Sequence, residues 1–576
     1  MRYFNHNNYS VQLTCKYSFL IASWQYEKLK RCEDLLDVRE TLSLLPQNLT
    51  DLYEFTFSEK ARKVRAAIIL VFCFLYYCAW PMNVEGMEAA IATDLDDQLE
   101  GGIVPDPSAT WGILPMCEPF IVIVEFPGSK VVHLAHHTIK EYLTSKVSSE
   151  ALVQQGIASD TFAHFIIARV CLENLLQSSS IGSLPVGKGR PKRLPDTIPL
   201  NSYAARHWAN HYREACIFRD ASQDLLNELG LKLVEDKSAY QKWLSIYDPE
   251  KEHTDKETSV QTGPIQATPL YYMSLLGVTG VARLLLEDGA EVEARGGHYC
   301  TALHAASSNG HRDMVELLLS CGADVNARDE SNGTALQIAS WRGNEDVVRT
   351  LLGAGAEIND QGGHYGSALN AAVKYGHETT VRLLIEYGAE VDSKDRLGWT
   401  VLHSAARSGN ESIVRLLLIH GAKVHSQDSL ERTVLHAAVK SCNESLVRLL
   451  LEWGADIDAR GCSGTALQIA SYFGDRTVVE ILIKEGANIN TIADPYGTAL
   501  QAAAHRGNED VARLLLKHGA NLYAEEGKYG TAMNAALAAG HKDVVALFDR
   551  HEEERKHSHR PISIRTAGLR PPHEGF

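Results

Sequence analysis

The second half of the chain repeats one pattern of apolar and polar positions, nine times, almost always at a spacing of 33 residues. Each copy begins with a Thr or Ser that is followed by two further residues, of which the last is Leu or Met. The nine anchors are Thr268-Pro269-Leu270, Thr301-Ala302-Leu303, Thr334-Ala335-Leu336, Ser367-Ala368-Leu369, Thr400-Val401-Leu402, Thr433-Val434-Leu435, Thr465-Ala466-Leu467, Thr498-Ala499-Leu500 and Thr531-Ala532-Met533. A fixed period of this length is typical of a stacked array of small units and not of a globular enzyme.

Residues 301–328 show which elements each copy predicts. A small apolar face on a first short helix is formed by Leu303, Ala305 and Ala306. Asn309-Gly310 ends that helix, because glycine adopts the left-handed conformation of a tight turn. A second helix carries an apolar stripe at spacings of three and four: Met314, Val315, Leu317, Leu318 and Leu319. Because so small a helix pair cannot bury its apolar face alone, the core must come from stacking.

The pattern T-P-L-H-x-A-A…G…V-x-x-L-L…G-A-x-x-N resembles the ankyrin repeat over residues 264–550. The resemblance implies a mainly α protein with an ankyrin-repeat solenoid of about nine repeats. The His of the family pattern is present as His304, His403 and His436. Five repeats carry an amide there instead: Gln337, Asn370, Gln468, Gln501 and Asn534. We expect these amides to hydrogen-bond within the first turn as the His does, so that the fold is retained.

The N-terminal half has no such period. Residues 17–46 predict two amphipathic helices, residues 66–80 an uncharged apolar helix and residues 84–93 a short helix. The apolar segment ends before Pro81 and is shorter than the roughly 20 residues of a spanning helix, so we expect a buried core helix and no membrane span. Residues 120–126 and 131–134 predict a β-hairpin. Helices followed by one hairpin suggest a helical, winged-helix-like domain.

Several segments of this half resemble the region after the NTPase core of fungal NACHT–ankyrin proteins, the NOD-like receptors of filamentous fungi. Their motif v-x-L-x-H-x-S-v-x-E-Y-L corresponds to residues 132–143, and their Y-A-A-x-x-W segment to Tyr203-Ala204-Ala205-Arg206-His207-Trp208. Two weaker matches are residues 44–53 and 78–85. The resemblance implies a sensor in fungal self/non-self recognition, with the repeats sensing the ligand.

We therefore expect six segments along the chain. They are residues 1–60, resembling the end of a NACHT module; 61–150, a winged-helix-like domain; 151–247, a helical linker region; 248–263, a charged linker; 264–550, the ankyrin repeats; and 551–576, a disordered tail.

The chain begins after the place where the P-loop of those receptors would lie. Gly182-Ser183-Leu184-Pro185-Val186-Gly187-Lys188 spells GxxxxGK, but Gly189 follows, so no hydroxyl is available for Mg²⁺. Pro185 within the match favours a loop, and we expect no nucleotide site. The alternative is that the sequence is a truncated gene model of a NACHT NTPase signalling switch whose P-loop lies upstream.

Other chemistry is weakly indicated. His207 and His211 stand four residues apart, as in zinc enzymes, but the Glu of HExxH is missing, so we expect structural histidines and no metal or other cofactor. Eleven cysteines without a CxxC pair favour a reducing, cytoplasmic setting. A formal net charge of −16 argues against a nucleic-acid partner. We expect no catalytic residues and no enzyme.

The two positions that close the first helix of each unit face the concave groove in the ankyrin family. In the third to eighth repeats these positions are mostly basic or aromatic, although the chain is acidic. The ten groove residues are Trp341, Arg342, Lys374, Tyr375, Arg407, Lys440, Tyr472, Phe473, His505 and Arg506. Arginine and aromatic residues concentrate binding energy at interfaces. The hypothesis is that they bind an acidic, partly extended segment of a protein partner.

An alternative stays open for the same surface. Acidic residues stand at the tips of the fingers that connect the repeats: Asp329, Glu330, Asp395, Asp428, Glu431, Glu525 and Glu526. These carboxylates and the groove cations would then merely neutralise each other on a solvated surface.

Overall fold

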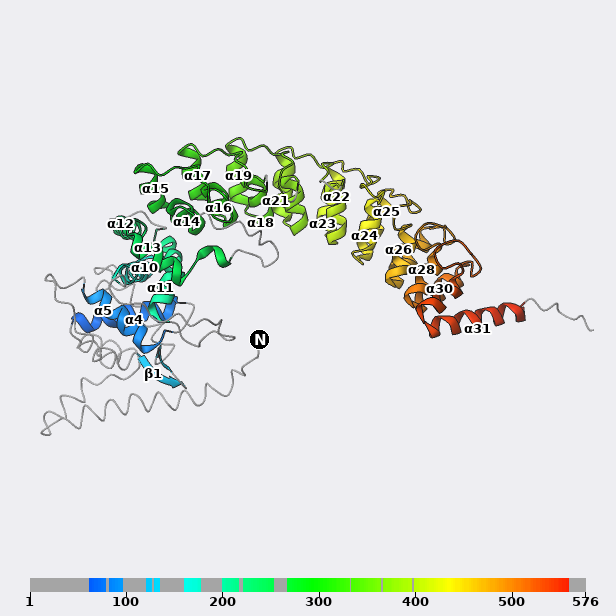
Figure 1. Cartoon of the computed structure of the whole chain (residues 1–576), viewed down its shortest axis with the longest axis horizontal. Helices are drawn as coiled ribbons and strands as arrows, with labels where there is room; N and C mark the ends of the chain where they lie inside the picture. Colours follow the sequence, from blue (N-terminus) through cyan, green and yellow to red (C-terminus); the bar gives the residue numbers. More distant parts are fainter. Residues whose placement is uncertain are drawn as a thin grey trace, which may run out of the picture. The chain divides into compact units, whose positions relative to one another are not determined.

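The computed structural model describes residues 62–78, 82–96, 121–126, 129–134, 160–177, 199–216, 221–252, 267–331, 333–363, 366–395 and 398–558 (Figure 1). The chain divides into two compact units, Met1–Ala305 and Ala306–Phe576. Several predictions lie outside the described residues: the helices of residues 17–46, the motif of residues 44–53, most of the motif of residues 132–143, and the GxxxxGK match at residues 182–188.

The first part of unit 1 combines two helices with one hairpin. Helices α4 (Arg62–Tyr77) and α5 (Val84–Asp96) pack against strand β2 (Ser129–Leu134), which pairs antiparallel with β1 (Ile121–Phe126). The apolar face of α4 is buried through Ile68, Leu70, Val71, Cys73 and Phe74, so the predicted core helix is confirmed. No helix in the described part of the chain is both long and apolar enough to cross a membrane. The hairpin is also confirmed, whereas the winged-helix assignment remains a prediction.

Four helices follow in unit 1: α10 (Asp160–Gln177), α11 (Leu200–Ala215), α12 (Ala221–Glu235) and α13 (Lys237–Ile246). Their core continues into the first repeat, formed by α14 (Pro269–Leu276) and α15 (Thr279–Glu287). Trp243 is fully buried, with its ring 5.9 Å from that of Trp208 and 6.1 Å from that of Tyr272. Its indole N–H donates to the carbonyl of Ala205 over 2.9 Å. These helices therefore supply the first repeat with a packed neighbour.

The start of the predicted charged linker is ordered. A short 3-10 helix, η2 (Pro249–Glu252), follows α13. One carboxylate oxygen of Glu250 accepts hydrogen bonds from the Tyr271 hydroxyl, at 2.7 Å, and from the His298 backbone N–H, at 2.5 Å. The linker thus begins with residues that bind the first and second repeats of unit 1, and residues 253–266 lie outside the described residues.

Nine helix pairs follow the 33-residue pattern within the described repeats. After α14 the first helices are α16 (Ala302–Ser308), α18 (Ala335–Arg342), α20 (Ala368–Tyr375), α22 (Val401–Ser408), α24 (Val434–Val439), α26 (Ala466–Phe473), α28 (Ala499–Arg506) and α30 (Ala532–Ala539). After α15 the second helices are α17 (Arg312–Ser320), α19 (Glu345–Gly353), α21 (Glu378–Glu386), α23 (Glu411–Ile419), α25 (Glu444–Glu452), α27 (Arg476–Lys484), α29 (Glu509–Lys517) and α31 (Lys542–Ser558). Within unit 2, α18 and α24 lie on the inner side of the array, and α19 and α25 on the outer side (Figure 1).

Local sequence explains where these helices begin and end. In the first helices the anchor hydroxyl caps the N-terminus, as where the Ser367 Oγ accepts the Asn370 N–H over 3.1 Å. The same helix ends at Gly376, which has a φ of 77°. Alanines on the first helices and leucines on the second are buried, so that neighbouring repeats approach closely and share one core.

The last helix corrects one expected boundary. Helix α31 continues past residue 550 to Ser558, so the first residues of the predicted disordered tail (551–576) are helical. Residues 559–576 lie outside the described residues.

Candidate functional site

In several repeats the side chain that follows the anchor leucine bonds to the next repeat. The Nδ1 atom of His436 accepts the Thr433 N–H over 3.0 Å, and its Nε2–H donates to the Gly464 carbonyl over 2.9 Å. The amide of Gln468 makes the equivalent hydrogen bonds: its Oε1 accepts the Thr465 N–H over 2.7 Å, and its Nε2 donates to the Gly497 carbonyl over 2.5 Å. The expectation that an amide hydrogen-bonds within the first turn is confirmed for Gln468, whereas the buried Oδ1 of Asn370 has no hydrogen-bond partner among the described residues. The bond to the following finger holds that finger against the first helix.

The ten groove residues fall into three clusters along unit 2. The first cluster joins α18 to α20. The guanidinium carbon of Arg342 lies 4.1 Å from the centroid of the Trp341 ring, and the Trp341 and Tyr375 rings meet edge to face at 5.9 Å. Lys374 is exposed beside them, and 47% of Tyr375 is exposed. A cation and two aromatic rings therefore share one surface.

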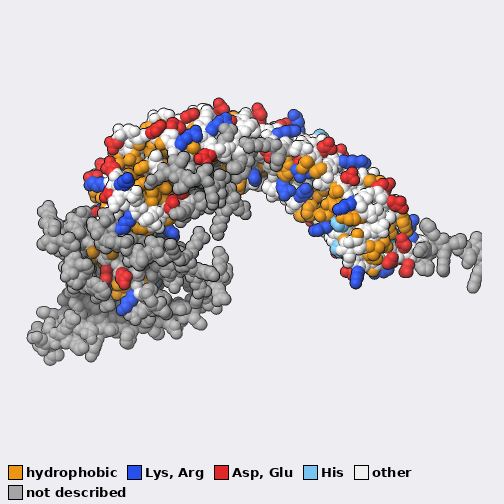
Figure 2. Space-filling view, in the orientation of Figure 1, with side chains coloured by type: hydrophobic (Ala, Val, Ile, Leu, Met, Phe, Trp, Pro, Cys, Tyr) orange, Lys and Arg blue, Asp and Glu red, His pale blue; other side chains and the backbone are white. Residues whose placement is uncertain are grey.

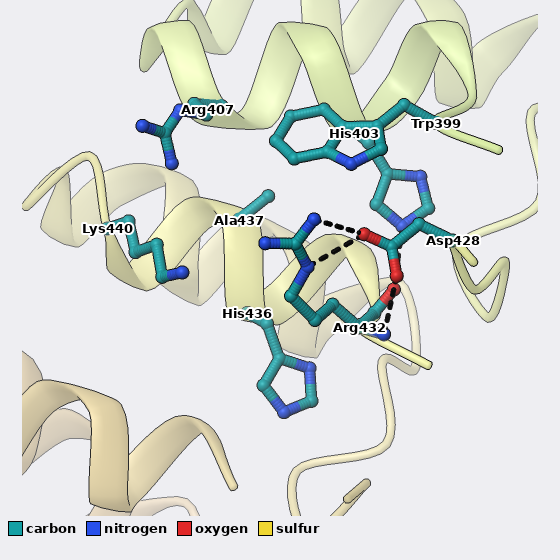
Figure 3. Close-up of a pocket in the computed structure, with 8 residues that line it drawn as sticks. All are labelled: Trp399, His403, Arg407, Asp428, Arg432, His436, Ala437 and Lys440. Carbon is teal, nitrogen blue, oxygen red and sulfur yellow. Dashed lines mark hydrogen bonds and ion pairs between the residues drawn. The ribbon is translucent and has the colours of Figure 1, made fainter. Parts of the chain in front are cut away.

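The second cluster forms a pocket between α22 and α24 (Figure 3). It brings together the predicted residues Arg407 and Lys440 with three that were not assigned to the groove, Trp399, Asp428 and Arg432. The remaining lining residues are His403, His436 and Ala437. The pocket is shallow and open to solvent; the space in and above it, open solvent included, is about 220 Å³. Its Trp399 ring lies 5.2 Å from the guanidinium carbon of Arg432 and 5.9 Å from that of Arg407.

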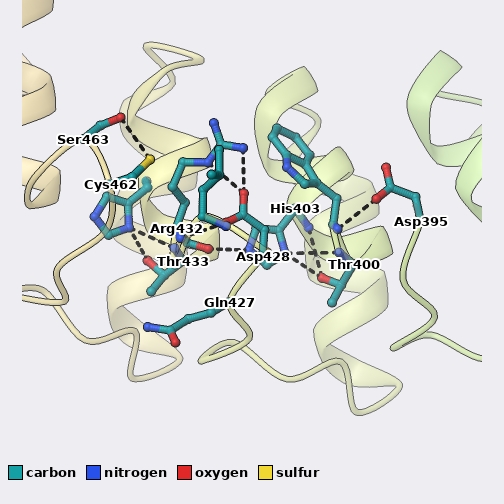
Figure 4. Close-up of polar contacts among 12 residues, drawn as sticks. Asp395, Thr400, His403, Gln427, Asp428, Arg432, Thr433, Cys462 and Ser463 are labelled. Atoms are coloured by element: carbon teal, nitrogen blue, oxygen red, sulfur yellow. Dashed lines mark hydrogen bonds and ion pairs between the residues drawn. The ribbon is translucent and has the colours of Figure 1, made fainter. Parts of the chain in front are cut away.

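Asp428 is the acidic group of this pocket, and its carboxylate accepts hydrogen bonds from residues of its own finger (Figure 4). One oxygen accepts the N–H groups of Leu430 and Arg432, each over 2.9 Å, and the other accepts both Nε and Nη2 of Arg432 over 2.7 Å. Burial alone would raise the pKa of Asp428, but the hydrogen bonds from Arg432 and the finger backbone lower it below its usual range.

Two further finger-tip carboxylates accept hydrogen bonds from the backbone of their own fingers. Asp395 accepts the Trp399 N–H over 2.9 Å, and Asp329 accepts the Gly333 N–H over 2.7 Å. These bonds fix the shape of the fingers. Asp428, by contrast, pairs with the pocket cation Arg432, as the alternative of mutual neutralisation predicts at that one point.

The pocket carries more positive than negative charge. Burial, together with the neighbouring charges of Arg432 and Arg407, lowers the pKa of Lys440. Burial also lowers the pKa values of His403 and His436, so both rings are neutral near pH 7. The pocket thus holds three cations, Arg407, Arg432 and Lys440, and one carboxylate, Asp428, which is paired with Arg432.

The third cluster spans α26 and α28. The rings of Tyr472 and Phe473 are perpendicular at 5.6 Å, and the guanidinium carbon of Arg506 lies 4.8 Å from the Tyr472 centroid. The finger residue Tyr496 lies 4.6 Å from Tyr472. In the same way, His505 stacks on the finger residue Tyr529 at 4.5 Å. Cations again lie against aromatic rings.

The sequence analysis missed the finger residues that complete these clusters. Trp399, Arg432, Tyr496 and Tyr529 each stand one or two positions before an anchor Thr. The recurrence was the available signal: an aromatic or arginine residue stands one or two positions before six of the nine anchors, though not before Thr268, Thr334 or Thr465. On the face that Figure 2 shows, Lys and Arg side chains alternate with hydrophobic ones over the repeats.

The His207/His211 pair belongs to the core of unit 1. His211 is buried, and hydrogen bonds join its Nε2 to the Tyr203 hydroxyl, at 2.6 Å, and its Nδ1 to Nδ1 of His164, at 2.7 Å. Burial, followed by the charges of His164 and His207, lowers the pKa of His211 to about 3. Among the residues the structure describes, no group of three or more His, Cys, Asp or Glu side chains could hold a metal ion.

Comparison with known families agrees with the repeat architecture. The family model described as ankyrin repeats (3 copies) matches residues 239–329, 270–362, 336–428, 420–493 and 467–554, which together cover more than half of the chain. The chain belongs to the ankyrin-repeat family. This architecture is that of a scaffold for protein–protein interaction.

A fungal protein shares part of this sequence. The chain is 29% identical over 299 residues to the azaphilone pigments biosynthesis cluster protein L of Monascus ruber. The shared region takes up 50% of this chain and 61% of that relative, so the chain spans less than two thirds of the relative's length.

Proposed function

We propose that this chain is a non-catalytic scaffold whose groove residues bind an acidic, partly extended segment of a protein partner. The observation that carries the proposal is the clustering of cations on aromatic rings in a chain whose net charge is −16. Finger-tip carboxylates at Asp329, Asp395 and Asp428 are bound within their own loops. An acidic partner would supply the missing negative charge.

The spacing of the clusters supports an extended ligand. They stand on α18 and α20, on α22 and α24, and on α26 and α28, which follow one another along unit 2. A partner that contacts more than one cluster must therefore run along several repeats. Half-exposed rings such as Phe473, 54% exposed, gain binding energy when a partner covers them.

A second part of the proposal concerns the signalling pathway in which the scaffold acts. We assign the scaffold to fungal NOD-like receptor signalling in the cytoplasm, where the repeats would sense a ligand for self/non-self recognition. Support comes from the Y-A-A-x-x-W segment, which lies in α11, and from the fungal source of the relative. The printed name of that relative refers to a pigment biosynthesis cluster and assigns no activity that would carry over.

Affinity capture from fungal extract tests the proposal. The bait is compared with a groove variant, Trp341→Ala/Lys374→Glu/Arg407→Glu, and with a control of the same composition, Trp453→Ala/Lys423→Glu/Arg415→Glu. The control residues are exposed, and two of them form ion pairs outside the groove clusters, Lys423 with Asp392 and Arg415 with Glu411. We expect partners that the native chain and the control retain and the groove variant loses.

Circular dichroism establishes that both variants keep the helical content of the native chain before capture. Recovery of the same partners by a folded groove variant would refute the proposal.

A further inference from the structure

The pocket around Trp399 has a more specific chemistry than the other two clusters. We infer that it is a subsite for a phosphorylated side chain, phosphoserine or phosphothreonine, within the partner segment. This inference rests on the proposed function of the groove and specifies the ligand at one point of it. The argument depends on charge, on the donors around the opening and on what holds them in place.

The charge of the pocket exceeds what one carboxylate neutralises. Three side chains, Arg407, Arg432 and Lys440, are positive, and only Asp428 is negative. Burial keeps His403 and His436 neutral near pH 7. A phosphate monoester carries a charge of about −1.5 to −2 at pH 7, whereas Glu or Asp carries a single charge. The excess of two positive charges matches the phosphate.

The donors are also of the right kind. Arginine offers a planar fork of N–H groups to phosphate oxygens, and lysine acts as a compact charge with three donors. Figure 3 shows Arg407, Arg432 and Lys440 around one opening, with Ala437 between them. Because the Ala437 side chain is short, it leaves space at the centre of these cations. A phosphate has three strong acceptor oxygens, enough to engage all three side chains.

Arg432 is held in place before any ligand binds. Both its Nε and its Nη2 bond to Asp428, whose side chain is fully buried. The Trp399 ring lies against the guanidinium groups of Arg432 and Arg407, which limits their movement. Its indole N–H is buried and has no hydrogen-bond partner among the described residues. Fixed donors lose little conformational entropy on binding, which favours a specific subsite.

Peptide binding tests this assignment. Three fluorescein-labelled oligoglutamate peptides differ only at the central position, which is phosphoserine, glutamate or serine, and their affinities are measured by fluorescence anisotropy with the full chain. We expect the phosphoserine peptide to bind about tenfold more tightly than the glutamate peptide. Arg407→Gln and Lys440→Gln should each abolish most of this preference. Arg415→Gln removes one charge from an exposed ion pair outside the pocket and should leave the preference unchanged.

The outcomes separate the two proposals. Equal affinity for phosphoserine and glutamate peptides, with both weakened by the Arg407→Gln change, would refute the phosphate subsite and leave the acidic-segment groove intact. Absence of binding by all three peptides would refute both. A preference for phosphoserine that survives Arg407→Gln and Lys440→Gln would place the phosphate elsewhere and overturn the inference. Tighter binding of a single-stranded RNA of matched length would also overturn it, in favour of a nucleic-acid backbone.

Discussion

At the scale of single residues, a buried polar side chain after the anchor leucine stabilises the contact between neighbouring repeats in several places. Gln468 and His436 both cap their own helix and donate to a carbonyl of the next finger. A buried carbonyl without a hydrogen-bond donor lowers the stability of the folded chain, so each of these few bonds contributes substantially to the free energy of unfolding.

Gln468→Ala should lower the free energy of unfolding by about 1–3 kcal/mol, because it leaves the Thr491 carbonyl without its donor and the Thr465 N–H without its acceptor. Gln468→His is the matched control, since His436 makes equivalent bonds one repeat earlier, and it should lower the free energy by less than about 1 kcal/mol. Urea unfolding followed by circular dichroism measures both. Equal losses in the two variants would contradict the role of the second hydrogen bond.

His211 should make the stability of unit 1 depend on pH. Its pKa is about 3 in the folded chain and 6.5 ordinarily, so below pH 6.5 the unfolded state takes up a proton that the folded state does not. Stability attributable to His211 therefore falls as the pH falls from 6.5 towards 3, by about 2 kcal/mol at pH 5. Pulsed hydrogen exchange of α11 peptides against urea measures this at pH 7 and pH 5.

His211→Gln provides the comparison, because glutamine stays neutral over this range. The variant should lose about 2 kcal/mol less than the native chain between pH 7 and pH 5. An identical loss in both proteins would show that His211 does not titrate as its burial implies.

The sequence predicts some residues of the pocket between α22 and α24 but not all of them. Arg407 and Lys440 were assigned because they close first helices, whose position follows from the period. Trp399 and Arg432 were missed because they belong to fingers, and hydrogen bonds across repeats, such as that of His403 to the Arg432 carbonyl, bring a finger against the neighbouring first helix. The distance between a finger residue and the neighbouring first helix depends on tertiary packing, and the 33-residue period of the sequence does not predict it.

At the scale of helices and strands, stability comes from second helices that each bury leucines between two neighbours. Leu417 of α23 is fully buried, whereas Ile419 of the same helix is 64% exposed. Contacts in such arrays join each repeat to its neighbours only. Damage to one helix should therefore spread over a short distance.

Leu417→Ala should lower the free energy of unfolding by about 2–5 kcal/mol, through lost apolar burial and the cavity left behind. Hydrogen exchange should increase most in α21, α23 and α25 and least in α29. Ile419→Ala is the control and should change stability by no more than about 0.5 kcal/mol. Uniform acceleration of exchange from α4 to α31 would be inconsistent with nearest-neighbour stabilisation.

The elements themselves were predictable where a period or a cap defines them. First helices begin at a capping Thr or Ser and end at a glycine of positive φ, as at Ser367 and Gly376. The charged linker was not predictable, since the hydrogen bonds of Glu250 to Tyr271 and His298 depend on residues distant in sequence. The end of α31 was also misjudged, because a polar helix carries no apolar stripe to mark it.

At the scale of the whole molecule, an acidic chain concentrates cations and aromatic rings along one part of unit 2. The three clusters run from α18 to α28, and each sets at least one arginine against an aromatic ring. Association driven by such a surface should weaken as salt screens the charges. The proposed function therefore requires that these residues bind acidic chains.

The most direct measurement is the affinity of the full chain for a fluorescein-labelled oligoglutamate peptide, by anisotropy, at low and at physiological salt. The account predicts saturable binding that weakens with salt, that falls at least about tenfold in Trp341→Ala/Lys374→Glu/Arg407→Glu, and that persists in Trp453→Ala/Lys423→Glu/Arg415→Glu. Equal affinity of both variants for the peptide, or no binding by the native chain, would contradict it.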